Sequence, residues 1–72
     1  MLITPEEKKW FQAEYPVGHQ LRLIWAGGEA TLQEGDMGTI IKNNARAGHI
    51  IVKWDSGSTS KLVYGNFLAE VL

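Results

Sequence analysis

The pattern of apolar and polar residues divides the chain into one N-terminal helix and a series of short strands. The segment Thr4-Pro5-Glu6-Glu7 is a capping box, in which threonine and the glutamate three residues later each accept the other's backbone N–H. Proline also suits the first helical position. Pro16 disfavours helical geometry at the residue before it. The sequence therefore predicts a helix at about residues 5–14.

From residue 19 onward the spacing of apolar residues becomes that of strands. Alternation over residues 20–25 predicts a first strand with Leu21, Leu23 and Trp25 on the inward face. In the last strand, Leu68 and Val71 are expected to be buried. The predicted strands are residues 20–25, 37–42, 49–54, 58–63 and 67–72. Gly38 inside the second of them indicates a bulge or a close backbone approach.

The third and fourth strands give the strongest β signal, and the turn between them fixes their register. A three-residue loop at residues 55–57, with Gly57 left-handed, is a favoured hairpin geometry. A two-residue loop would instead place Lys61 on the buried side opposite Val52. The inward-facing residues of the predicted hairpin are then Ile50, Val52, Trp54 and Leu62.

These elements predict a mainly β fold, a small five-stranded SH3-like barrel with one N-terminal α-helix. The 72 residues suffice for one domain, with the helix at about 5–14 and the barrel at about 19–72. A long first loop at residues 26–36 and a tight turn at 64–66, expected to be 3₁₀-like, match the SH3-like order. The helix is expected to pack outside the barrel and to cover three outward-facing aliphatic residues, Ile24, Ile51 and Val63.

Composition narrows the classes of function. The chain has no cysteine, which removes thiolate metal sites and cysteine nucleophiles and fits a reducing compartment. The formal net charge of −1 lacks the positive excess of most nucleic-acid-binding domains. No apolar run approaches the roughly 20 residues of a membrane span, and the first residues are acidic where a secretory signal is basic. A cytoplasmic protein without a membrane partner is expected.

Three stretches carry a resemblance to a known family: residues 15–18 (YPVG), 35–40 (GDMGTI) and 52–58 (VKWDSGS), the last continuing to 63–65 (VYG). In this order they resemble the domain-of-unknown-function family 4314, short bacterial and phage proteins. The resemblance implies an SH3-like fold and a bacterial or mobile-element origin, and no known activity. The hairpin also looks like that of Mib/Herc2-type SH3-like domains, which bind peptides. The first loop departs from the family pattern, because it has Gly27 and Gly28 where proline is usual.

Site chemistry argues against an enzyme and against a cofactor. The only catalytic set that can be imagined is Ser58, His49 and Asp55. His49 and Asp55 would lie at opposite ends of one strand, roughly 17–20 Å apart. His19 and His49 have no second histidine at ligand spacing, so no metal site is predicted.

Three kinds of partner stay open. The favoured one is a protein or peptide, bound near the first loop on a surface of Trp25, Asp55 and Tyr64, as in SH3-like barrels. The second is nucleic acid, bound on the outer hairpin face. The third is a second copy of the chain, with a monomer or weak homodimer expected. The basic residues assigned to nucleic-acid binding are Arg22, Lys42, Arg46, Lys53 and Lys61.

Overall fold

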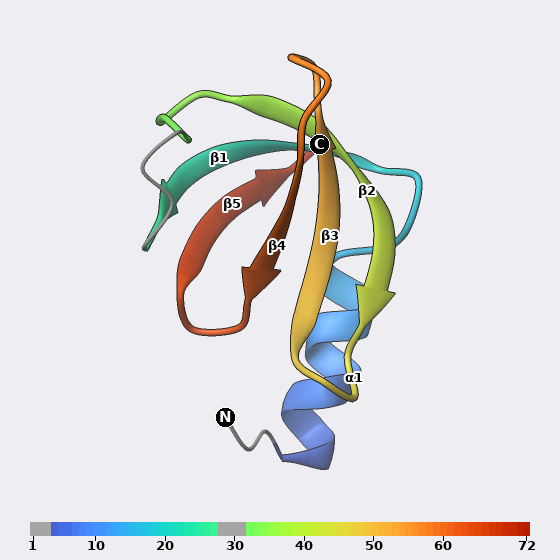
Figure 1. Ribbon diagram of the computed structural model, residues 1–72. Coiled ribbons are helices and arrows are strands. Elements are labelled where there is room, and N and C mark those ends of the chain that lie inside the picture. Colours follow the sequence, from blue (N-terminus) through green and yellow to red (C-terminus); the bar gives the residue numbers. More distant parts are fainter. Residues whose placement is uncertain (1–3, 28–31) are drawn as a thin grey trace.

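One helix and five strands make up the part of the chain that the computed structural model describes, residues 4–27 and 32–72 (Figure 1). Part of the predicted first loop, residues 28–31, lies outside it. The order of elements confirms the predicted mainly β fold class. The elements are α1 (Pro5–Glu14), β1 (Gln20–Ala26), β2 (Met37–Asn44), β3 (His49–Trp54), β4 (Thr59–Val63) and β5 (Phe67–Val71).

The five strands form one antiparallel sheet in the order β4-β3-β2-β1-β5. Figure 1 shows this sheet strongly curved, with β1 and β5 lying behind β3 and β4. Strands β4 and β5 are the two edges, and within the described residues they do not pair with each other. The sheet is therefore open, and the predicted closure into a barrel is not confirmed.

The β3–β4 hairpin has the predicted register. Val52 is opposite Ser60, and the turn closes through a 2.8 Å hydrogen bond from the Trp54 N–H to the Ser58 carbonyl. Gly57 has φ +102°, the left-handed geometry that its place in the loop requires. The Trp54 side chain is 3% exposed, and its indole N–H donates to the Ser60 hydroxyl at 2.9 Å. The prediction that Trp54 belongs to the core is confirmed.

Gly38 lies where β2 passes under the Trp54 ring. A Cβ at this position would lie 2.9 Å from Cε3 of Trp54 and 2.6 Å from Cγ1 of Val52. The predicted close approach is thus present at Gly38, whereas the irregularity in the β2–β3 pairing comes later, between Ile40 and Lys42.

The inward orientation predicted for Trp25 is wrong, because the pairing of β1 with β5 shifts between Leu23 and Trp25. Such a bulge adds one residue to a strand and reverses the faces that follow it. Ile24 and Trp25 are therefore both exposed, at 47% and 51%.

Of the two residues predicted to be buried in the last strand, one lies on the inward face and the other does not. Phe67 is opposite Ala26 and is 6% exposed, so the inward-facing positions are Phe67, Ala69 and Val71. Leu68 then points outward and is 59% exposed, and the prediction that it is buried is wrong. Val71 is half-buried. The turn before this strand is a β-turn closed by the Asn66 N–H and the Val63 carbonyl, with Gly65 at φ +83°, rather than a 3₁₀ turn.

Helix α1 begins at the predicted capping box and packs on the inner side of the sheet. The Thr4 hydroxyl accepts the Glu7 N–H at 3.1 Å, and the Glu7 carboxylate accepts the Thr4 N–H at 3.0 Å. Phe11 is fully buried, with its ring 6.5 Å from that of Phe67. The expectation that the helix covers Ile24, Ile51 and Val63 on the outward face is wrong, because its residues Phe11 and Tyr15 join the core instead.

One side chain of β2 fastens the end of the helix to the sheet. The amide nitrogen of Asn43 donates to the carbonyl oxygens of Phe11 and Tyr15, at 3.2 and 2.9 Å. The Tyr15 carbonyl at the helix end thereby gains a partner, and the Phe11 carbonyl, which also accepts the Tyr15 N–H at 3.2 Å, gains a second one. The amide oxygen of Asn43 is buried without a hydrogen-bond partner among the described residues. The second strand was predicted to end at residue 42, before Asn43, so this link was missed.

Replacing this donor is expected to loosen the helix. In Asn43→Asp a carboxylate would face two carbonyl oxygens and the negative end of the helix dipole. The free energy of unfolding should fall by about 2–3 kcal/mol, as when a buried group loses its partner. Urea denaturation at neutral pH measures the change. The control is Asn44→Asp, because that side chain serves only as an acceptor, for the Ala47 N–H, and a carboxylate can take its place. Equal losses in both variants would contradict the role assigned to Asn43.

Candidate functional site

An aromatic groove lies between α1 and the turn that joins β4 to β5. Its volume is about 220 Å³. Phe11, Tyr15 and Phe67 form its floor and are almost fully buried, whereas Trp10 and Leu68 at its rim are 50% and 59% exposed. We call this surface the aromatic groove and define it by its lining residues, which are Trp10, Phe11, Tyr15, Tyr64, Gly65, Phe67 and Leu68.

The rings of the groove hold one another in edge-on and tilted contacts. Trp10 meets Tyr15 edge-on, with ring centroids 6.0 Å apart and planes at 89°. It also meets Tyr64, at 6.2 Å and 76°. Edge-to-face pairs of this kind are each worth about 0.5–1.5 kcal/mol beyond the area that they bury. The exposed indole of Trp10 is thus held in place from two sides, which suits it to act as a fixed contact surface.

Carboxylates surround the exposed part of the groove on the helix. Residues three and four apart share a helix face, so the helical neighbours of Trp10 include Glu6, Glu7 and Glu14. Glu14 lies in the last turn, where a negative charge opposes the helix dipole, and no basic residue lies in that turn. The surroundings of Trp10 on this face are therefore acidic.

Tyr64 and Glu7 connect the two sides of the groove. A hydrogen bond to Glu7, together with burial and the negative charge of Glu7, raises the pKa of the Tyr64 hydroxyl. The pKa of Glu7 is lowered, first by the Thr4 backbone N–H and then by the hydroxyls of Tyr64 and Thr4. Burial and the charge of Glu14 raise the pKa of Tyr15. The tyrosine hydroxyls are neutral donors next to carboxylates at ordinary pH.

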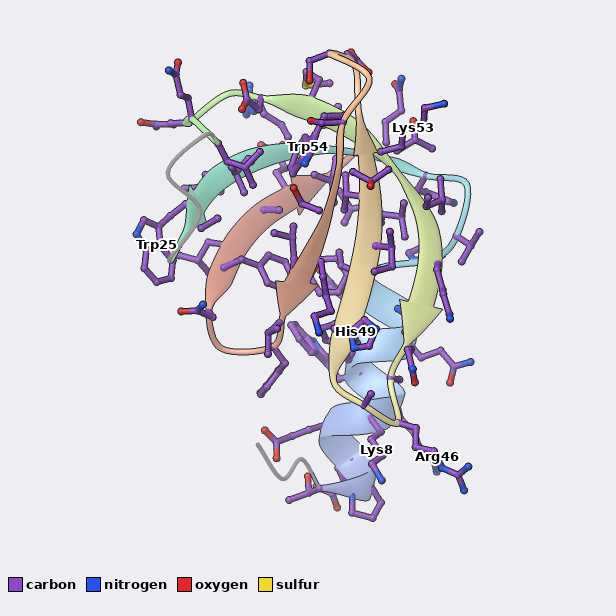
Figure 2. All side chains as sticks on the ribbon, viewed as in Figure 1. Lys8, Trp25, Arg46, His49, Lys53 and Trp54 are labelled. Carbon is purple, nitrogen blue, oxygen red and sulfur yellow. The ribbon has the colours of Figure 1, made fainter. Side chains whose placement is uncertain are left out.

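The three residues predicted to bind a partner lie in different places. Tyr64 lines the aromatic groove. Asp55 is in the β3–β4 turn, at the other end of a five-residue strand from Tyr64, roughly 17 Å away at strand rise. Trp25 lies at the edge of the molecule in Figure 2. It does not line the groove, although Leu68, its partner in the pairing of β1 with β5, does.

The predicted basic residues separate into two sets. Lys42, Lys53 and Lys61 are exposed on the outer face of β2, β3 and β4, and Arg46 lies in the turn that joins β2 to β3. We call these four residues the basic face. Arg22 is on β1, where it forms a salt bridge with Glu70 of the neighbouring β5.

His49 reports the electrostatic character of the basic face. It lies at the start of β3, in front of the sheet in Figure 2. Its pKa is lowered by burial first and then by the positive charges of Lys61 and Lys42. Burial and the two ammonium groups all disfavour the protonated imidazole at this position.

The catalytic set considered from the sequence is not brought together in the structure. His49 and Asp55 are at opposite ends of β3, as the sequence predicts. Within residues 4–27 and 32–72, no three histidine, aspartate or glutamate side chains gather in a group that could hold a metal ion. In the same part of the chain no helix is long and apolar enough to cross a membrane.

Sequence reasoning found only part of the groove. The pairing of Phe11 with Tyr15 four residues later, and their need for a packing surface, could be inferred from the helix alone. What the sequence did not indicate is that these residues meet Tyr64 and Leu68, which are 49 to 57 positions away along the chain. Trp10 at the rim was left without a partner for the same reason.

Comparison with protein-family models gives a match over residues 4–71 to the family described as "Domain of unknown function (DUF4314)". Comparison with curated proteins gives no match, and neither does comparison with solved structures.

The contact of Glu7 with Tyr64 and Thr4 predicts a pH-dependent stability. A carboxylate whose pKa is lowered by folding stabilises the fold above its ordinary value of 4.5, and the effect is lost as pH falls through the lowered value. Glu7→Gln should therefore melt below wild type at neutral pH, and the difference should shrink at pH values stepped below 4.5. Thermal melts measure both. Glu6→Gln removes the same charge one residue away and should show a smaller change, so equal effects in the two variants would contradict the assignment.

Proposed function

Because the chain belongs to the DUF4314 family, defined as a domain of unknown function, we propose a function from the geometry of its surfaces: a non-enzymatic binding module for a protein or peptide. The aromatic groove takes an apolar side chain of the partner, and basic residues next to that side chain meet the surrounding glutamates. The single observation that carries the proposal is the half-exposed indole of Trp10, held between Tyr15 and Tyr64 over a buried apolar floor.

The size of the groove favours a side chain over a cofactor. Pockets that hold drug-sized molecules have volumes of roughly 300–1,000 Å³. At about 220 Å³ the aromatic groove is smaller than these and fits one or two side chains of a longer ligand. Peptides bind through such anchors, because one buried side chain fixes a segment whose remaining contacts are shallow.

The charges around the groove favour a basic partner. Trp10 and Tyr64 present aromatic rings, whose faces attract the cations of arginine and lysine. Glu6, Glu7 and Glu14 add negative charge on the same side of α1. A partner cation would also relieve the unfavourable placement of Glu14 at the negative end of the helix. An acidic partner would meet repulsion at every one of these positions.

Two further features support the proposal. The strand order β4-β3-β2-β1-β5, with a long connection after β1, is the order expected of an SH3-like fold, and such folds present peptide sites at their loops. The chain has no cysteine, which is consistent with the cytoplasmic location that the proposal includes.

The exposed tryptophans provide a matched pair of variants for the test. Trp10 and Trp25 are 50% and 51% exposed, and only Trp10 lines the groove. The probes are short synthetic peptides with a central leucine or phenylalanine flanked by arginines, and the same peptides with glutamates instead. Wild type and Trp25→Ala should bind the arginine peptides, with shifts of the Tyr64, Gly65 and Leu68 amides in an NMR titration. Trp10→Ala should weaken binding at least tenfold, about 1.4 kcal/mol.

Urea denaturation of each variant establishes that loss of binding is not loss of folding. Leu68→Ser is the second groove variant, since this side chain is 59% exposed and its removal spares the core. Preferential binding of the glutamate peptides would refute the charge argument. Equal weakening by Trp10→Ala and Trp25→Ala would show that the peptides do not distinguish the groove from another exposed indole and would refute the groove.

A further inference from the structure

The strand register places three lysines in neighbouring positions on one face of the sheet. Lys42 and Lys61 are the two partners of Ile51, one on each side of it. Their backbones are therefore two strand spacings apart, roughly 9.5 Å. Lys53 is two residues further along β3, on the same face, between Thr39 and Thr59. The inner face of the same strands carries the core residues Ile40, Ile50, Val52 and Leu62.

No negative charge interrupts this arrangement. Strands β2, β3 and β4 contain no aspartate or glutamate. Within the described parts of the chain the one salt bridge is that of Arg22 with Glu70, in which none of the three lysines takes part. Arg46 adds a fourth positive charge, at the end of the face where β2 turns into β3. Four of the seven basic residues of a chain with net charge −1 thus belong to the basic face.

The positively charged lysines of the basic face repel one another. A separation of roughly 10 Å is about one Debye length at 0.1 M salt, so repulsion between the lysines is not fully screened. After burial, the positive charges of Lys61 and Lys42 lower the pKa of His49, because they repel a protonated imidazole. A ligand that brings negative charge to several of these positions together would relieve the repulsion.

The chemistry of the face selects among anionic ligands. Besides the ammonium groups it offers the hydroxyls of Thr39 and Thr59, which bind phosphate oxygens well. Its aromatic ring is the His49 imidazole, half-buried at the start of β3, whereas Trp54 of the same strand points into the core. Single-stranded nucleic acids are usually held by stacking of successive bases on large exposed rings, which strands β2, β3 and β4 do not present on this face. Ile51 and Val63 are half-buried within the sheet, and Ile41, at the irregularity of β2 before Lys42, is 47% exposed. One exposed aliphatic side chain offers little to insert into a membrane.

We propose that the basic face binds the phosphate backbone of a nucleic-acid duplex without reading its sequence, through Lys42, Lys53, Lys61 and Arg46. This function is separate from the aromatic groove and does not depend on it. Four phosphate contacts release about four counterions, so the logarithm of the binding constant should fall with that of the salt concentration with a slope of about −3.6. Binding is then weak at physiological salt and is best observed at low salt.

The proposal is tested by fluorescence anisotropy with two labelled DNA duplexes of unrelated sequence. Binding of each duplex is measured over a series of potassium chloride concentrations. Wild type should bind both duplexes alike with the steep slope. In Lys42→Gln/Lys61→Gln the slope should decrease in size by about 1.8, because each lost phosphate contact removes about 0.9. The matched control is Lys9→Gln/Arg22→Gln, which changes the net charge equally away from the face. Its slope should equal that of wild type.

Further measurements on the same variants decide whether the basic face binds a duplex. Exposed lysines replaced by glutamine should change stability by less than about 0.5 kcal/mol, which urea denaturation verifies. Absence of binding at low salt, equal loss in the two double variants, or tighter binding of the single strand would overturn the proposal. Binding to phosphatidylserine vesicles without binding to the duplex would assign the face to a membrane and overturn it as well. Trp10→Ala should bind the duplex like wild type, which separates this result from that of the groove.

Discussion

Burial of the Phe11 ring inside an open sheet is the contact on which the rest of the structure depends. The sheet is curved but not closed, so its inner face needs a cover from outside the strands. The helix supplies it: Phe11 is fully buried and packs on Phe67 and Tyr64, while Asn43 holds the helix end against β2. This docking leaves Trp10, one position earlier, at the surface. The groove is thus a by-product of how the helix closes the core.

Local signals in the sequence predicted local structure well. The capping box set the start of α1, and the length of the 55–57 turn set the register of β3 and β4. Both depend on residues only a few positions apart, whose preferences are strong. Trp25 was assigned to the wrong face because a bulge next to Ile24 has no recognisable residue pattern. Leu68 was misassigned because nothing nearby fixes the phase of a short strand.

The sequence predicted surface residues only where the alternation along a strand determines which side chains share a face. The predicted hairpin register already put Lys53 and Lys61 on one face, and the pairing of β2 with β3 places Lys42, which the sequence had also singled out, beside them. The aromatic groove required the long-range meeting of α1 with β5 and could not be assembled from the sequence. A net charge of −1 also concealed that acidic and basic residues are separated, glutamates beside Trp10 and lysines on the sheet.

The pairing of β1 with β5 has a consequence for how the protein is made. Leu21 is opposite Val71, so strands from the two ends of the chain must meet, and β5 also delivers Phe67 to the ring of Phe11. Contacts between distant positions form slowly because a long loop must close first. During synthesis on the ribosome, the helix and the central hairpin can form early. The core remains exposed to water until β5 has left the ribosomal exit tunnel and paired with β1. Until then Phe11 is exposed and could be bound by a chaperone.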